Sequence, residues 1–132
     1  MNAAVDTNIL LRAVMQDDMK QARAAMHLLS NADSIAISLP CFCEFAWVLG
    51  KVYKIGKPDI AAAIETYVQA RNVVTDRSAV DAGLAILYAG GDFADGVLAY
   101  EGRRLGADTF VSFDKEAVKL LTRQGQPAKL LS

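Results

Sequence analysis

Five carboxylates in this 132-residue chain stand where they could do chemistry. Asp6 follows an apolar run at 3–5, Asp114 follows another at 109–113, and a helical pattern begins directly after each aspartate. Ligands of parallel α/β sheets bind outside the carboxyl ends of the strands, so both aspartates are candidates for one shared site. The full set of candidate acids is Asp6, Glu44, Asp92, Asp95 and Asp114.

A site built from carboxylates, without histidines or paired thiols, favours a hard cation. Mg²⁺ and Mn²⁺ prefer oxygen ligands, and Mg²⁺ keeps several of its waters. In an acidic pocket such an ion lowers the pKa of an attacking water and neutralises the charge that grows on a phosphate. The residue types therefore predict metal-dependent hydrolysis of a phosphodiester.

Each aspartate also has a structural interpretation, because Asp is a good helix N-cap worth about 1 kcal/mol. Asp92 and Asp95 have the spacing of a capping box. Glu44 fits this interpretation poorly, because it lies past the first residue of its predicted helix, in the apolar sequence Phe42-Cys43-Glu44-Phe45-Ala46-Trp47. Burying it there without a partner would be costly. Two alternatives stay open for Glu44: a metal ligand, or a side chain that faces solvent.

Alternating strand and helix patterns must position these acids. Apolar and β-branched runs predict strands at 3–5, 35–37, 73–74, 109–113 and 129–131. Periodic apolar positions predict helices directly after Asp6 and at 18–31, 41–53, 59–70, 77–89, 92–105 and 115–121. This alternation predicts an α/β fold, a single domain over 1–132, with a parallel sheet covered by helices on both faces.

Composition narrows the classes of function. No apolar run approaches the roughly 18 residues that span a bilayer, and no export signal is recognisable, so we expect a cytoplasmic protein without a membrane segment. The net charge of −1 means that nucleic acid would have to bind a local basic rim. A zinc site needs about four soft ligands, whereas the chain has two cysteines, interpreted as apolar filling, and one histidine.

Four motifs, in order and spacing, resemble the PIN-domain ribonucleases, and in particular the toxin halves of prokaryotic VapBC toxin–antitoxin pairs. The motifs are Val5-Asp6-Thr7-Asn8-Ile9-Leu10-Leu11-Arg12, Glu44-Phe45-Ala46-Trp47-Val48-Leu49, Asp92-Phe93-Ala94-Asp95-Gly96-Val97-Leu98-Ala99 and Thr109-Phe110-Val111-Ser112-Phe113-Asp114. Two positions depart from the family pattern: Gly96 stands where Ala is usual, and Ser112 where Thr is common. Neither departure removes a carboxylate.

The resemblance implies a three-layer α/β/α sandwich around a central parallel sheet, and cleavage of RNA with Mg²⁺ or Mn²⁺. It places the catalytic and metal-binding acids at Asp6, Glu44, Asp95 and Asp114, with Asp6 and Asp95 as direct ligands. It also implies a homodimer, neutralised by an antitoxin protein whose tail covers the acidic pocket. Accessory roles, in which small polar or acidic side chains support the four acids, fall on Thr7, Asn8, Asp92 and Ser112.

Contacts to the substrate are less marked in the sequence. Trp47 and Phe93 have the chemistry to stack on bases, but their helical spacing favours core packing. Two further functions stay open: an RNA-binding or housekeeping RNA-processing member without toxin activity, and a receiver-like phosphoacceptor domain. The second would need a pair of acids after the first strand, where this chain has Asp6-Thr7. The candidate phosphate-binding cations are Arg12, Lys51, Lys54, Arg77 and Lys115.

Overall fold

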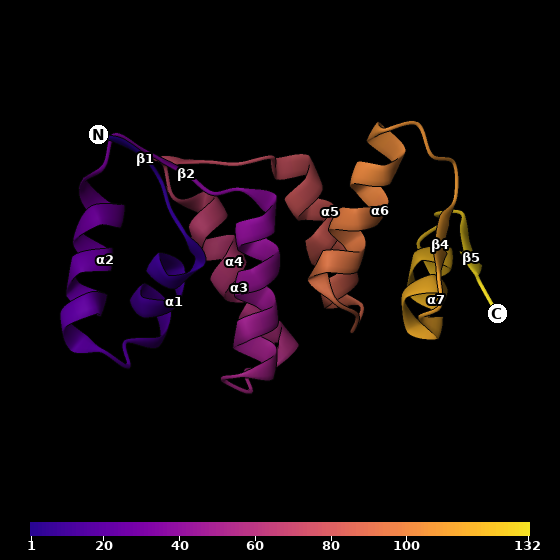
Figure 1. Cartoon of the computed structure of the whole chain (residues 1–132), viewed down its shortest axis with the longest axis horizontal. Helices are drawn as coiled ribbons and strands as arrows, with labels where there is room; N and C mark the ends of the chain where they lie inside the picture. Colours follow the sequence, from indigo (N-terminus) through magenta and orange to yellow (C-terminus); the bar gives the residue numbers. More distant parts are fainter. The chain divides into compact units, whose positions relative to one another are not determined.

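Strands and helices alternate along the chain in the order that the sequence predicts (Figure 1). The structure, a computed structural model, describes residues 1–132 and divides into two units, Met1–Asp76 (the N-terminal unit) and Arg77–Ser132 (the C-terminal unit). All strand pairs are parallel, which confirms the predicted α/β class. No helix has the length and apolar character that crossing a membrane requires.

The N-terminal unit is a three-stranded parallel sheet with four helices. The strands are ordered β1-β2-β3, with Ala3 opposite Ile35 and Ile35 opposite Val73. Helix α1 packs against α2 and α3, and α3 packs against α4. The elements are β1 (Asn2–Ala4), α1 (Thr7–Met15), α2 (Met19–Asn31), β2 (Ser34–Ala36), α3 (Leu39–Lys51), α4 (Lys57–Gln69) and β3 (Val73–Val74).

The core of this unit is built largely from the apolar stripe of α3. Phe42 and Phe45 are fully buried, and the Phe45 ring meets Tyr67 of α4 edge to face, with 5.7 Å between ring centroids. The Tyr67 hydroxyl donates a 2.8 Å hydrogen bond to the carbonyl oxygen of Leu10, which joins α4 to α1. Burial raises the pKa of Tyr67, so this phenol stays protonated and keeps donating. These contacts set the position of α3 relative to α1.

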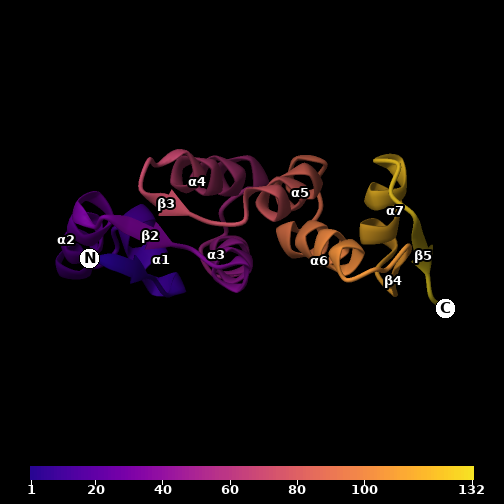
Figure 2. The ribbon, with the colours of Figure 1, turned by 90° about the horizontal axis from the view of Figure 1, so that it is seen from above.

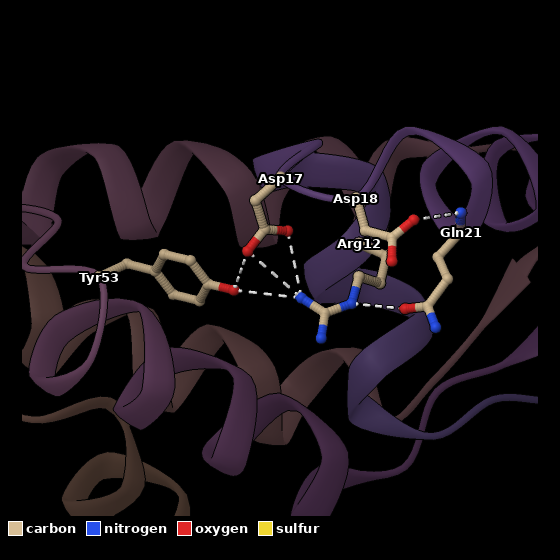
Figure 3. A network of polar contacts seen from close by, with 5 residues as sticks. All are labelled: Arg12, Asp17, Asp18, Gln21 and Tyr53. Carbon is tan, nitrogen blue, oxygen red and sulfur yellow. Dashed lines mark hydrogen bonds and ion pairs between the residues drawn. The ribbon is translucent and has the colours of Figure 1, made fainter.

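A polar network holds the corner between α1 and α2 against the segment that follows α3 (Figure 3). The Arg12 guanidinium donates to Gln21 at 2.7 Å and to Asp17 at 3.1 Å, and the Tyr53 hydroxyl donates to Asp17 at 2.8 Å. The carboxylate of Asp18 caps α2 by accepting from the backbone N–H of Gln21 at 3.0 Å. Arg12, a candidate phosphate contact in the sequence, therefore has an intramolecular role.

The C-terminal unit pairs two helices and adds a two-stranded parallel sheet. Helices α5 and α6 lie side by side, as Figure 2 shows. Ile86, Ala99, Leu120 and Leu121 form a buried cluster, against which Phe110 packs. The elements are α5 (Arg77–Tyr88), α6 (Phe93–Arg104), β4 (Phe110–Ser112), α7 (Lys115–Arg123) and β5 (Ala128–Leu130), with β4 paired to β5.

The two aromatic side chains considered as stacking surfaces differ in burial. Phe93 is 2% exposed and packs against α5 at Gly83, which confirms the prediction of core packing. Trp47 is 60% exposed, so the same prediction for Trp47 is wrong. The reason is geometric: the buried face of α3 is filled by Phe42, Phe45 and Leu49, and Trp47 lies on the opposite side of the helix.

Candidate functional site

Three carboxylates of the C-terminal unit lie together. One carboxylate oxygen from each of Asp92, Asp95 and Asp114 lies within 4.8 Å of the other two. Asp92 is the N-cap residue of α6, Asp95 stands in the first turn of α6, and Asp114 is the N-cap residue of α7, two residues after the end of β4. The cluster forms because the N-terminus of α6 and the carboxyl end of β4 come together.

Asp114 is both a helix cap and a member of the cluster. Its Oδ1 accepts hydrogen bonds from the backbone N–H groups of Glu116, at 2.9 Å, and Ala117, at 3.1 Å. The backbone N–H of Asp114 in turn donates to the Ser112 hydroxyl oxygen at 3.0 Å. The two interpretations of this aspartate are therefore compatible, since capping holds the carboxylate at the end of the strand. The Ser112 side chain therefore helps to hold the backbone of Asp114 in position.

The predicted capping box at the start of α6 is wrong. Asp92 occupies the N-cap position, but its side chain makes no capping hydrogen bond. Burial raises the pKa of the Asp95 carboxyl, and the charges of Asp92 and Asp114 raise it further. Like charges held this close disfavour full ionisation, and a bound cation would reverse that effect. The electrostatics of the cluster thus depend on what binds to it.

The donor set fits Mg²⁺ or Mn²⁺. All three side chains offer carboxylate oxygens, the ligand type that these ions prefer. Oxygens on opposite sides of a Mg²⁺ ion lie about 4.2 Å apart, since each ligand stands about 2.1 Å from the metal. Three oxygens around one such ion include at most one opposite pair, and neighbouring oxygens are about 3.0 Å apart, so the 4.8 Å limit of the cluster is slightly wider than a shared ion requires. Asp92, expected only as an accessory acid, belongs to this geometry as much as Asp95 and Asp114 do.

The other two predicted acids belong to the N-terminal unit. Asp6 is the N-cap residue of α1, where its Oδ1 accepts from the backbone N–H of Ile9 at 3.2 Å. Glu44 stands in the second turn of α3, is exposed, and makes no hydrogen bond or ion pair. The Glu44 side chain faces solvent, which is the second of the two alternatives. It therefore pays no free energy for burial on an apolar face.

The charges of Asp6 and Glu44 both act on one buried thiol, that of Cys41. Burial raises the pKa of Cys41, and the charges of both acids raise it further. The Thr7 hydroxyl, itself only 8% exposed, donates to the Cys41 sulfur at 3.8 Å. Thr7 and Cys41 thus hold the start of α1 against the start of α3.

The contact between Thr7 and Cys41 goes beyond the predicted roles of both residues. Cys41 was interpreted as apolar filling, and it is indeed buried. Its place one turn before Glu44 on the same helix was the signal that it would lie near that acid. Asn8, the other predicted accessory residue of this segment, is exposed. The structure therefore groups the predicted site residues as two sets, one within each unit.

The PIN domain family profile matches residues 3–120 of the chain. The matched span includes every acid of both sets and extends through both units. The match confirms the predicted fold class, an α/β/α sandwich with parallel strands. No curated protein matches the chain with a significant score.

Proposed function

The chain belongs to the PIN-domain family, whose members are in general metal-dependent nucleases, and from this premise we propose that it is a metal-dependent endoribonuclease. The observation that carries the proposal is the cluster of Asp92, Asp95 and Asp114, whose oxygens suit a divalent ion. We propose the predicted acids as the residues on which the reaction depends, with Asp6, Glu44, Asp95 and Asp114 as catalytic acids and Asp92 as an accessory acid.

The residues have distinct tasks in this site. A bound Mg²⁺ or Mn²⁺ lowers the pKa of water and neutralises charge on the phosphate. Asp92, Asp95 and Asp114 would hold the ion, and the N-terminus of α7 together with Ser112 keeps Asp114 in place. Glu44 is exposed and its oxygens have no hydrogen-bond partner, which is the property that a proton acceptor in the reaction needs. The water oxygen bonds to phosphorus as the bond to the leaving oxygen breaks.

The finer assignment is a VapBC-type toxin that acts in the cytoplasm. The resemblance of all four motifs to these toxins supports it, and it implies a homodimer and a cognate antitoxin protein. We expect expression of the chain alone to arrest growth, and co-expression of a small neighbouring antitoxin gene to relieve the arrest. Unimpeded growth with an active enzyme would instead favour a housekeeping role in RNA processing.

Cleavage of a mixed RNA pool tests the nuclease activity. We expect cleavage with Mn²⁺ that stops with EDTA, and that is lost in Asp6→Asn and in Asp95→Asn. The matched control is Asp18→Asn, because Asp18 caps α2 with the same type of hydrogen bond as Asp6 makes in α1. Asn is also a good N-cap, so both variants keep their caps and only the charge differs.

Three outcomes would contradict the assignment. Cleavage that survives EDTA would show that the reaction does not depend on a metal. Cleavage that survives both Asp6→Asn and Asp95→Asn would show that these carboxylates do not hold the reacting groups. A chain that binds RNA but never cleaves it would be the RNA-binding member of the fold.

A further inference from the structure

The exposed face of α3 carries an aromatic side chain that the proposed function has not used. Trp47 is 60% exposed, whereas Phe42 and Phe45 of the same helix are fully buried. A large aromatic ring costs free energy when it is left in water. The exposed ring of Trp47 is therefore available to a ligand that covers it.

Trp47 lies in line with a catalytic acid and a cation. Glu44, Trp47 and Lys51 are separated by three and four residues, the spacings that place side chains on one face of a helix. At 1.5 Å per residue, Trp47 lies about 4.5 Å and Lys51 about 10.5 Å beyond Glu44 along the axis. All three side chains are exposed, so one ligand can contact all of them.

The charge of this face is not compensated within the protein. Lys51 is exposed and forms no ion pair or hydrogen bond, and the same holds for Lys54, three residues further on. Arg12 contrasts with them, because Asp17, Gln21 and Tyr53 hold its guanidinium. The two lysines therefore retain their full capacity to bind an anion.

From this juxtaposition we propose that the face Glu44-Trp47-Lys51 of α3 binds single-stranded RNA, with a base stacked on Trp47 and a phosphate on Lys51. The proposal rests on the proposed function, since it treats Glu44 as the end of the face where cleavage occurs. A ligand that combines flat π-faces with negative charge at each step matches an exposed aromatic ring with a cation, Lys51, one turn further along the helix. Bases paired within an RNA duplex are not free to stack on a side chain, so single strands are the substrate class.

Trp47 is the only tryptophan of the chain, so its fluorescence reports on this face alone. The probe is an unstructured RNA of about 12 nucleotides, within the usual range for single-strand sites. It is titrated in metal-free buffer, where no cleavage proceeds. We expect the RNA to quench the fluorescence, and inorganic polyphosphate, which has charge but no bases, to leave it unchanged. An RNA duplex of equal length should quench far less.

Variants distinguish the contribution of base stacking to RNA affinity from that of charge. The affinity is measured from the fluorescence anisotropy of labelled RNA. Trp47→Leu should weaken binding roughly 5- to 100-fold, whereas Trp47→Phe, which keeps an aromatic face, should restore most of it. Lys51→Gln should lower the slope of log affinity against log salt by about 0.7, because one phosphate contact is lost. Trp47→Leu should leave that slope unchanged. Lys20→Gln is the matched control, since Lys20 is an exposed cation on α2.

The outcomes keep this proposal distinct from the nuclease assignment. RNA affinity unchanged in both Trp47→Leu and Lys51→Gln would overturn the proposal, even if the enzyme cleaves RNA. Quenching that depends on protein concentration alone, and a dimer that Trp47→Leu dissolves, would assign this face to a second copy of the chain and overturn it as well. Quenching by RNA without any cleavage would support the RNA-binding face while rejecting the nuclease.

Discussion

Gly96 stands in α6 one residue after Asp95, and we expect Gly96→Ala to destabilise the protein although alanine is the better helix former. A Cβ at this position would lie 2.7 Å from the Cα of Gly83 and 2.8 Å from the carbonyl carbon of Ala82, and closer still to the Ala82 oxygen. These are backbone atoms of α5, which cannot rotate away as a side chain can. The substitution must therefore push α5 and α6 apart.

The magnitude follows from two opposing effects. Helix propensity alone would make the alanine variant more stable by up to about 1 kcal/mol. Overpacking a close contact costs about 1–3 kcal/mol, and a contact with rigid backbone belongs at the upper end of that range. The expected net loss is about 2 kcal/mol in the free energy of unfolding. For a chain of this length that loss corresponds to a decrease of about 7 °C in Tm.

Urea unfolding followed by circular dichroism measures this loss, with Gly102→Ala as the matched control. Gly102 belongs to the same helix, but apart from its chain neighbours and the backbone of its own helix no heavy atom lies within 4 Å of its would-be Cβ. There propensity acts alone, so Gly102→Ala should be as stable as the wild type or gain up to about 1 kcal/mol. A Gly96→Ala variant as stable as the wild type, with an unchanged m-value, would refute the close approach of the two helices.

Three further predictions concern the carboxylates. Asp114→Ala removes the α7 cap and should lower the free energy of unfolding by about 1 kcal/mol, whereas Asp114→Asn keeps the cap. Both variants should lose the increase in Tm that Mn²⁺ gives the wild type. Equal stability of the two metal-free variants would contradict the capping role. Burial and two neighbouring charges raise the folded-state pKa of Asp95, which means that folding favours the protonated carboxyl. The stability that this protonated form contributes is present at low pH and is lost as pH rises through the raised pKa. Metal-free Asp95→Asn should accordingly exceed the wild type in stability at pH 7 and lose that advantage in acid, which urea unfolding at both pH values will measure. A Tyr53 hydrogen bond and the Arg12 guanidinium lower the pKa of Asp17, so its contribution is present at neutral pH and lost as pH falls through the lowered value. Tyr53→Phe should therefore move the acid-unfolding midpoint to higher pH, and an unchanged midpoint would show that this network adds nothing to stability.

Much of the local structure was readable from the chain because its causes are local. Alternating apolar runs placed every strand within about one residue of its position, and an acid after a strand marked the N-caps Asp6 and Asp114. Family membership also followed from motif order, since four short motifs at defined spacings depend on sequence alone. The proximity of Asp114 to Asp95 was predictable in kind, because strand ends and helix starts in an α/β fold meet at one edge.

Tertiary structure decided the properties that depend on a neighbouring element. Periodicity shows which residues of α3 share a face, but only the packing of α1 and α4 determines that Trp47 lies opposite the buried side. Helix propensity alone predicts that Gly96 destabilises α6 relative to alanine. The backbone of α5 lies so close to this position that only glycine fits. Arg12 has the charge of a phosphate ligand, but in the folded chain Asp17 and Tyr53 contact its guanidinium. A sequence specifies the side chains and their order along each helix, while the exposure and the partners of each side chain depend on residues distant in the chain that folding brings alongside.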